Sequence, residues 1–184
     1  MGIMPAFLLH RYVMNTLELY IEAFIRKIGL GSRYLSLILV IITALVVALR
    51  YLFNWAPIAL QEIMTYLHAG LFMLGAAYTL QQDGHVRVDV FYQHMSERKK
   101  HWINLLGTVF LLLPTCIFIF VICLPYVESS IAMNERSIEG NGLPYLFVLK
   151  SLLLVLPVLL ILQGLAHIIH YGLALKNLNQ TEGQ

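Results

Sequence analysis

The stretch WINLLGTVFLLLPTCIFIFVICL, which runs from Trp102 to Leu124, decides the fold class of this chain. No charged residue interrupts it. About 20 apolar residues in a helix cross the roughly 30 Å hydrocarbon core of a bilayer. A helix also satisfies its own backbone hydrogen bonds, which lipid cannot do. The stretch therefore predicts a membrane-spanning helix.

Three more stretches on either side have the same character, at residues 34–53, 63–80 and 145–171. The 184 residues are 59% hydrophobic and 12% charged, so a bilayer serves as solvent for much of the chain. These features predict an all-α membrane protein with four transmembrane helices. What remains is too short and scattered for a soluble catalytic domain, and we expect no enzyme activity.

The residues before the first span have a different pattern. Apolar residues recur at helical spacing between His10 and Ile28, with acidic and basic residues on the other side. This pattern predicts an amphipathic helix in the membrane interface; a short helix packed on the bundle is the alternative. Gly29 to Ser32 read as a break before the first span. The predicted organisation is residues 1–33, the four-helix domain 34–171 and a tail 172–184.

Basic residues predict the orientation. They cluster before the first span, between the second and third, and after the fourth, whereas Arg136 is the single basic residue in the connections 54–61 and 125–144. The positive-inside rule then places both termini in the cytoplasm and these two connections in the periplasm. We expect a multi-pass protein of a bacterial inner membrane, in contact with its lipids.

Ionisable residues inside spans are candidates for a functional role. Arg50 ends the first span and leans inward, whereas Glu62 opens the second and leans outward. An ion pair between them is one interpretation, and snorkelling or contact with a lipid headgroup is the other. Lys150 leans toward the periplasm, so snorkelling alone accounts for it.

Histidines raise a second possibility, a membrane-anchor subunit of a respiratory dehydrogenase, either with a cytochrome b-like haem or without one. His68 lies in the second span, and His167 and His170 lie near the inner end of the fourth. The expected depths of His68 and His167 differ too much for one haem to bridge them. Histidines within the bundle or at the interface are therefore the favoured interpretation, and we expect no cofactor.

Other chemical signatures are missing from the sequence. It contains no Gly-rich phosphate loop, no metal-spaced Cys/His cluster and no nucleophile–base set, and nothing indicates a nucleic-acid partner. Cys116 and Cys123 are too far apart along one helix to bond and are interpreted as packing residues. Pro114 and Pro157 are candidates for kinks.

An ordered set of short motifs resembles a known transporter family. The set is Arg50-Tyr-Leu-Phe-Asn54 with Trp55, then Glu62, Gly75-Ala-Ala-Tyr78 and His85-Val-Arg87-Val-Asp89, followed by Gly142-Leu-Pro144 and Leu149-Lys150-Ser151. In order and spacing it resembles the DctQ-type small membrane subunit of tripartite ATP-independent periplasmic (TRAP) transporters. The resemblance covers about residues 35–170.

The resemblance implies a role and partners. It implies a fixed scaffold for a large transmembrane subunit, which moves as an elevator and holds the substrate and sodium sites. A periplasmic substrate-binding protein would deliver small organic acids, either carboxylates or sugar acids. No substrate would bind this chain directly. The motif residues, namely Arg50, Asn54, Trp55, Glu62, His85, Arg87, Asp89 and Lys150, are candidates for structural or partner contacts.

Overall fold

The computed structural model describes residues 6–85, 92 and 94–181, with side chains described from residue 14 to residue 178 of these ranges. The described residues form long helices joined by short connections. These are α1 (Ala6–Phe53), α2 (Ile58–Gln81), α4 (Glu97–Gly107), the π-helical segment η1 (Thr108–Leu112), α5 (Leu113–Ala132) and α6 (Leu146–Thr181). Four stretches are long and apolar enough to cross a membrane, which confirms the predicted fold class.

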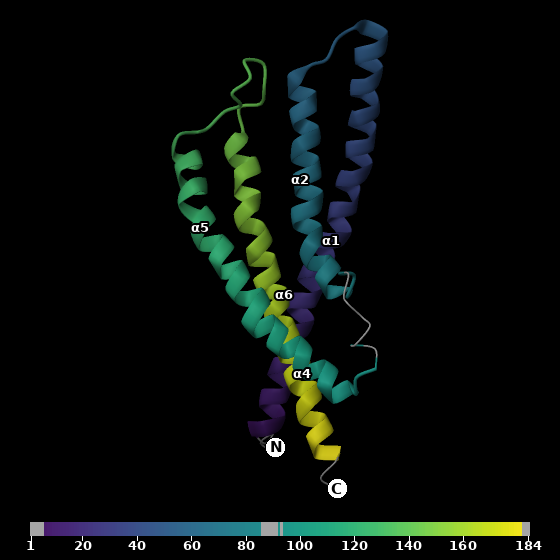
Figure 1. The fold of residues 1–184 in the computed structure, drawn as a ribbon, viewed down its shortest axis with the longest axis vertical. Coiled ribbons are helices and arrows are strands. Elements are labelled where there is room, and N and C mark those ends of the chain that lie inside the picture. The colour runs from purple at the N-terminus through teal and green to yellow at the C-terminus, as the bar shows by residue number, and fades with distance from the viewer. Residues whose placement is uncertain (1–5, 86–91, 93, 182–184) are drawn as a thin grey trace, which may run out of the picture.

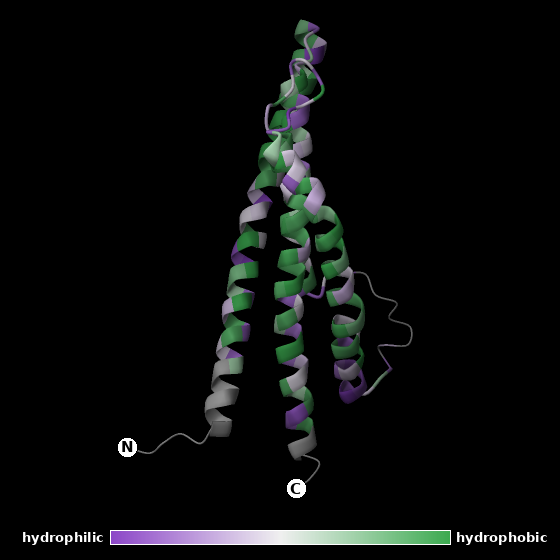
Figure 2. Ribbon diagram, turned by 90° about the vertical axis from the view of Figure 1, so that its left-hand side faces the viewer, coloured by the Kyte–Doolittle hydropathy of each residue, from purple (hydrophilic) through white to green (hydrophobic). Residues whose placement is uncertain are grey.

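The helices form two antiparallel pairs (Figure 1). α1 lies beside α2, and α5 lies beside α6, while α6 also contacts α1 and α2. Both termini lie at one end of the molecule, which we call the terminal end. The connections 54–57 and 133–145 lie at the other, the loop end. Viewed after a quarter turn, the helices that carry the two termini diverge from each other toward the terminal end (Figure 2).

α1 is one continuous helix of 48 residues, about 72 Å long. The predicted break at Gly29 to Ser32 is therefore wrong. A helical glycine costs only about 1 kcal/mol, and Ser32 Oγ donates a hydrogen bond back to the Gly29 carbonyl at 2.8 Å. Residues 10–28 continue the spanning helix rather than forming a separate one, and their place in the membrane interface stays a prediction.

Small residues bring α1 and α2 together near the middle of α1. The ring of Tyr78 lies directly over the backbone of Gly29, so that a Cβ there would come closer than 3.0 Å to it. Gly75 faces Ser32 in the same way, at ordinary van der Waals distance. We call these four residues the α1–α2 seam. Such close approach is how helices associate in lipid, where no hydrophobic force drives them together.

The third span changes its winding beside Pro114. The five residues of η1 precede this proline, and the amide of Leu113 bonds the carbonyl of Thr108, five residues back. A proline cannot donate to the carbonyl four residues before it and crowds it, and a π turn accommodates both effects. Gly164 of α6 lies against η1, with Leu112 and Leu113 just over 3 Å from where its Cβ would stand.

Burial is uneven among the spans. In the most apolar window of α6 33% of residues are buried within the chain, against 6% in α1. The core lies where Ile25 of α1, Ala77 of α2 and Leu159 of α6 meet. Cys116 is buried on α5, and it and Cys123 are free thiols.

Candidate functional site: a polar clasp at the loop end

The connection between α5 and α6 folds back on itself before α6 begins. The Ser137 amide donates to the Leu143 carbonyl at 3.1 Å, and the Gly142 amide donates to the Glu139 carbonyl at 2.9 Å. Leu146, the first residue of α6, donates its amide to the Glu135 carbonyl at 3.1 Å. These bonds close the connection into a compact loop.

Glu62 ties this loop to α2. Its carboxylate accepts a hydrogen bond from the Ser137 hydroxyl and another from the Leu143 amide, the latter at 2.5 Å. Gly142 lies against the pair, and a Cβ at this position would meet Ser137 and Glu62 closer than 3.0 Å. A carboxylate at the first turns of α2 therefore holds a loop that is about 80 residues away in sequence.

Lys150 ties the same loop to α6. Its ammonium lies 2.5 Å from a Glu135 carboxylate oxygen and 4.1 Å from the centre of the Tyr126 ring. The Lys150 side chain is 15% exposed and that of Glu135 30% exposed. The hydrogen bond from Lys150 lowers the pKa of the Glu135 carboxyl below its usual value. The Lys150 side chain leans toward the loop end, as the sequence predicts, but its ammonium group bonds the Glu135 carboxylate. We call Glu62, Glu135, Ser137, Gly142, Leu143 and Lys150 the clasp.

The proposed Arg50–Glu62 ion pair does not form. The structure gives Glu62 its partners in the loop, and Arg50 lies exposed on α1. The register of the two helices explains why. The Thr43 hydroxyl contacts the Met64 sulfur at 3.3 Å, so Glu62 lies near the level of residue 45, about 7 Å deeper than Arg50.

The other motif residues lie apart from the clasp. Asn54 takes a left-handed conformation, with φ 51°, and ends α1. The Trp55 amide then donates to the Leu49 carbonyl at 3.2 Å, while its ring is 59% exposed. His85 is exposed at the terminal end of the hairpin. Arg87 and Asp89 lie outside the described residues.

Sequence reasoning missed the partners of Glu62 and Lys150. It selected both of these residues, yet the one protein partner that it considered for Glu62 was Arg50, and it left Lys150 to snorkel toward the membrane surface. The loop acceptors and donors, Glu135, Ser137 and the Leu143 amide, were not selected. One signal was present, because a loop that carries Glu135 between two spans offers a carboxylate to a lysine near the start of the next span.

The terminal end is held together by other contacts. His170 Nδ1 of α6 lies 2.9 Å from Glu18 of α1, and Gln81 Nε2 of α2 donates to the Glu22 carbonyl at 2.9 Å. The ring of Tyr171 contacts the rings of His101, His167 and His170, with centroids 5.2–5.7 Å apart. These contacts join α1, α2, α4 and α6 at one level.

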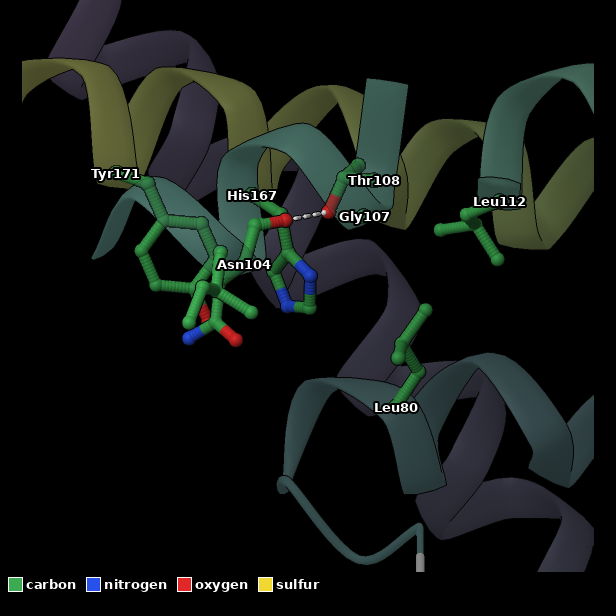
Figure 3. Close-up of a pocket in the computed structure, with 8 residues that line it drawn as sticks. Leu80, Asn104, Gly107, Thr108, Leu112, His167 and Tyr171 are labelled. Atoms are coloured by element: carbon green, nitrogen blue, oxygen red, sulfur yellow. Dashed lines mark hydrogen bonds between the residues drawn. The ribbon is translucent and has the colours of Figure 1, made fainter. Parts of the chain in front are cut away.

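A pocket of about 270 Å³ opens beside this aromatic group (Figure 3). Leu80 of α2, Thr108 of η1, Asn104 of α4 and the two α6 residues His167 and Tyr171 line it, together with apolar neighbours. The Thr108 hydroxyl donates to the Asn104 carbonyl at 2.8 Å, and the Asn104 amide donates to the Tyr92 hydroxyl at 2.8 Å. Thr108 and Asn104 thus have hydrogen-bond partners within the protein.

The arrangement of the histidines does not favour a shared haem. Ala77 and Leu159 pack together in the core of two helices that run in the same direction. His68 lies nine residues before the first and His167 eight residues after the second, so the two are separated by roughly 25 Å along the bundle. His68 is also exposed on α2. One haem iron cannot take both as axial ligands.

These features define a multi-pass membrane protein whose polar contacts lie mainly at its two ends. Residues 39–171 match the family described as "Tripartite ATP-independent periplasmic transporters, DctQ component". The chain therefore belongs to this family and is a component of a transporter, as the motifs predicted. Neither a curated protein nor a solved structure matched it.

Proposed function

We propose that this chain is the small scaffold subunit of a TRAP-type secondary transporter. In this proposal it acts with a large elevator subunit in the same membrane and a periplasmic substrate-binding protein. Together they import small organic acids, either carboxylates or sugar acids, by using a sodium gradient. The chain itself binds no solute and supports the part that moves.

The observation that carries this proposal is the family match over residues 39–171, which covers about the last third of the first span and the next three spans up to Tyr171. The shape of the molecule supports it. The two helix pairs cross and are braced at both ends, by the clasp and by the contact between His170 of α6 and Glu18 of α1. A frame fixed at both ends suits a subunit that must stay still while its partner moves.

The surface of α1 also supports a role in assembly. This helix has the same mean hydropathy as α6 in its most apolar window, 2.5, yet far fewer of its residues are buried within the chain. A spanning helix with so little internal contact has room for a partner subunit as well as lipid.

A transport assay tests the proposal. The chain alone, in vesicles with an inward sodium gradient, is expected to take up no organic acid, whereas the chain with the large subunit and binding protein takes it up under the same gradient. Omitting this chain from the complete system is expected to abolish uptake. Uptake by this chain alone would contradict the scaffold role.

The orientation is tested separately. We propose cytoplasmic termini in the bacterial inner membrane, because the terminal end also carries the basic residues of the N-terminal half of α1, of the first turn of α4 and of the last turns of α6. Single cysteines are introduced at Arg136 and Lys99 in a variant that lacks Cys116 and Cys123. An impermeant maleimide added to intact cells stripped of their outer membrane should label position 136 and spare position 99. The reverse pattern would overturn the orientation.

A further inference from the structure

The exposed residues of α2 form one stripe. Between Ile58 and Gln81 the structure leaves four residues exposed, namely Gln61, Thr65, His68 and Phe72. Their spacing of four, three and four places them on a single face of the helix. Three of the four are polar, and the fourth, Phe72, is 66% exposed. We call these residues the α2 stripe.

The stripe lies within the bilayer. His68 is ten residues from the start of α2 and thirteen from its end, so about 15 Å of helix separates it from the first end and about 20 Å from the second. α2 also has the lowest mean hydropathy of the four spans, 1.3 against 2.5 to 2.7. Thr65 and His68 are thus at the depth of lipid tails, whereas Gln61, three residues from the start of α2, lies near the boundary.

The chain itself satisfies little of this polarity. The Gln61 amide reaches the Ala56 carbonyl at 3.4 Å, and the Thr65 hydroxyl bonds back to the Gln61 carbonyl at 3.3 Å. Within the part of the chain that the structure describes, His68 has no hydrogen-bond or ion-pair partner. Lipid tails offer none either, and ionisable residues in membrane spans almost always face protein or water.

The outer face of α5 shows what a lipid-facing surface looks like in the same molecule. Its exposed residues between positions 117 and 122, namely Ile117, Phe118, Val121 and Ile122, are all hydrocarbon, and the single threonine Thr115 is exposed just before them. The contrast between α5 and α2 cannot come from depth, since both faces belong to spanning helices of one bundle. The difference indicates that α2 faces protein.

We propose that the α2 stripe is a docking face inside the membrane for a spanning helix of the large subunit. That helix presents hydrogen-bonding side chains opposite Gln61, Thr65 and His68, at successive levels about 5–6 Å apart along α2, and an apolar side chain opposite Phe72. Polar pairing of this kind between spanning helices gives both affinity and register. The inference rests on the proposed function, because it names the surface through which the two membrane subunits meet.

Apolar substitutions test the stripe, because they would affect a lipid-facing helix and a docking face in opposite ways. Gln61→Leu, Thr65→Val and His68→Leu each make α2 more hydrophobic, so a lipid-facing helix would insert and fold at least as well. A docking face instead loses a hydrogen bond with each change. Each variant is expected to bind the co-expressed large subunit about threefold more weakly, and the triple variant at least tenfold more weakly.

Thr115→Val provides the matched control, because Thr115 is an exposed threonine on α5. It is expected to leave recovery of the large subunit unchanged. Monodisperse elution of every variant shows that the chain itself is folded. Unchanged recovery with the triple variant would overturn the inference.

Photocrosslinking from single positions gives a second measurement that does not depend on affinity. A photoreactive phenylalanine analogue at position 68 is expected to crosslink to the large subunit, and the same analogue at position 122 to lipid. Crosslinks from position 68 to lipid alone, or to a second copy of this chain, would overturn the inference. If the wild-type chain does not bind the large subunit at all, the proposed function fails first. If it binds but crosslinks through other helices, the stripe alone is wrong.

Discussion

The α1–α2 seam and the clasp both hold α2 in place, the seam against α1 and the clasp against the loop before α6, and they do so by different means. The seam, around Gly29 and Tyr78, has almost no polar contact between the helices and depends on how closely two backbones approach. The clasp, around Glu62 and Lys150, depends on charged and polar groups that reach into a loop. One lies near the middle of the longest helix, and the other at the end where the loops emerge.

The difference follows from the surroundings of the two contacts, which are lipid tails at the seam and the membrane boundary at the clasp. Between spanning helices, apolar surface gains nothing by leaving lipid, so contact must come from close packing or from hydrogen bonds. Inside the bilayer, packing by small residues avoids the cost of unsatisfied polar atoms. Near the boundary, carboxylates and an ammonium group cost less free energy than they would inside the bilayer. We therefore expect the seam to respond to side-chain volume and the clasp to charge and pH.

The largest effect is expected at the seam. Gly29→Ala places a methyl group against the Cβ and ring of Tyr78, both fixed by packing, and should lower the free energy of unfolding by about 3 kcal/mol. Gly31→Ala is the matched control, since nothing lies within 4 Å of its Cβ, and it should be neutral or slightly stabilising. Thermal unfolding in detergent measures both. Equal shifts in the two variants would show that the seam is not closely packed.

The clasp has its own volume-sensitive position in Gly142. Gly142→Ala crowds Ser137 and Glu62 and should lower the free energy of unfolding by about 1–2 kcal/mol, less than at the seam because a loop can shift. Gly140→Ala, two residues away with open space around it, should change little. Limited proteolysis of the loop after α5 should be faster in the first variant alone. Equal cleavage of both would count against a closed loop.

Removing the carboxylate of Glu62 tests whether this residue acts in the clasp or in an ion pair with Arg50. Glu62→Ala leaves the Ser137 hydroxyl and the Leu143 amide without their acceptor and should lower Tm by a few degrees. Arg50→Ala should have no comparable effect, and the double variant should show the simple sum. Double-mutant analysis of Tm measures this. A clear departure from additivity would restore the ion pair.

The smallest effect concerns pH. Hydrogen bonding from Lys150 lowers the pKa of Glu135 in the folded protein. The pair therefore stabilises the fold at pH values above the usual pKa of a glutamate carboxyl, near 4.5. This stability is lost as the pH falls through the lowered pKa of Glu135. Tm should therefore decrease more on acidification from pH 5 to pH 3 in the wild type than in Glu135→Gln. Glu139→Gln, at an exposed position in the same loop, should show the same decrease in Tm between pH 5 and pH 3 as the wild type.

Sequence reasoning reached the four spans because hydropathy is a property of each helix alone. It also selected Glu62 and Lys150, since a charge in an apolar span is visible in one dimension. It could not supply their partners, because the loop that covers Glu62 is far away in sequence and its position depends on how the two pairs cross.

Gly29 shows a second limit of the sequence. A glycine between helical segments indicates a break or a close contact equally well, and the choice depends on whether a ring from another helix lies against it. Here Tyr78 does, and the helix continues. The same holds for the α2 stripe, whose exposure became visible only when the neighbouring helices were in place.

The unbroken course of α1 has a mechanical consequence. A helix of 48 residues without a hinge is a stiff rod, and Gly29, where it is pressed most closely against α2, lies at its midpoint. A tilt of about 10° around that point would move the two ends of the rod by about 6 Å in opposite directions. A displacement of the N-terminal half would in this way move Trp55, at the other end of the helix, without any change in the conformation of the helix itself.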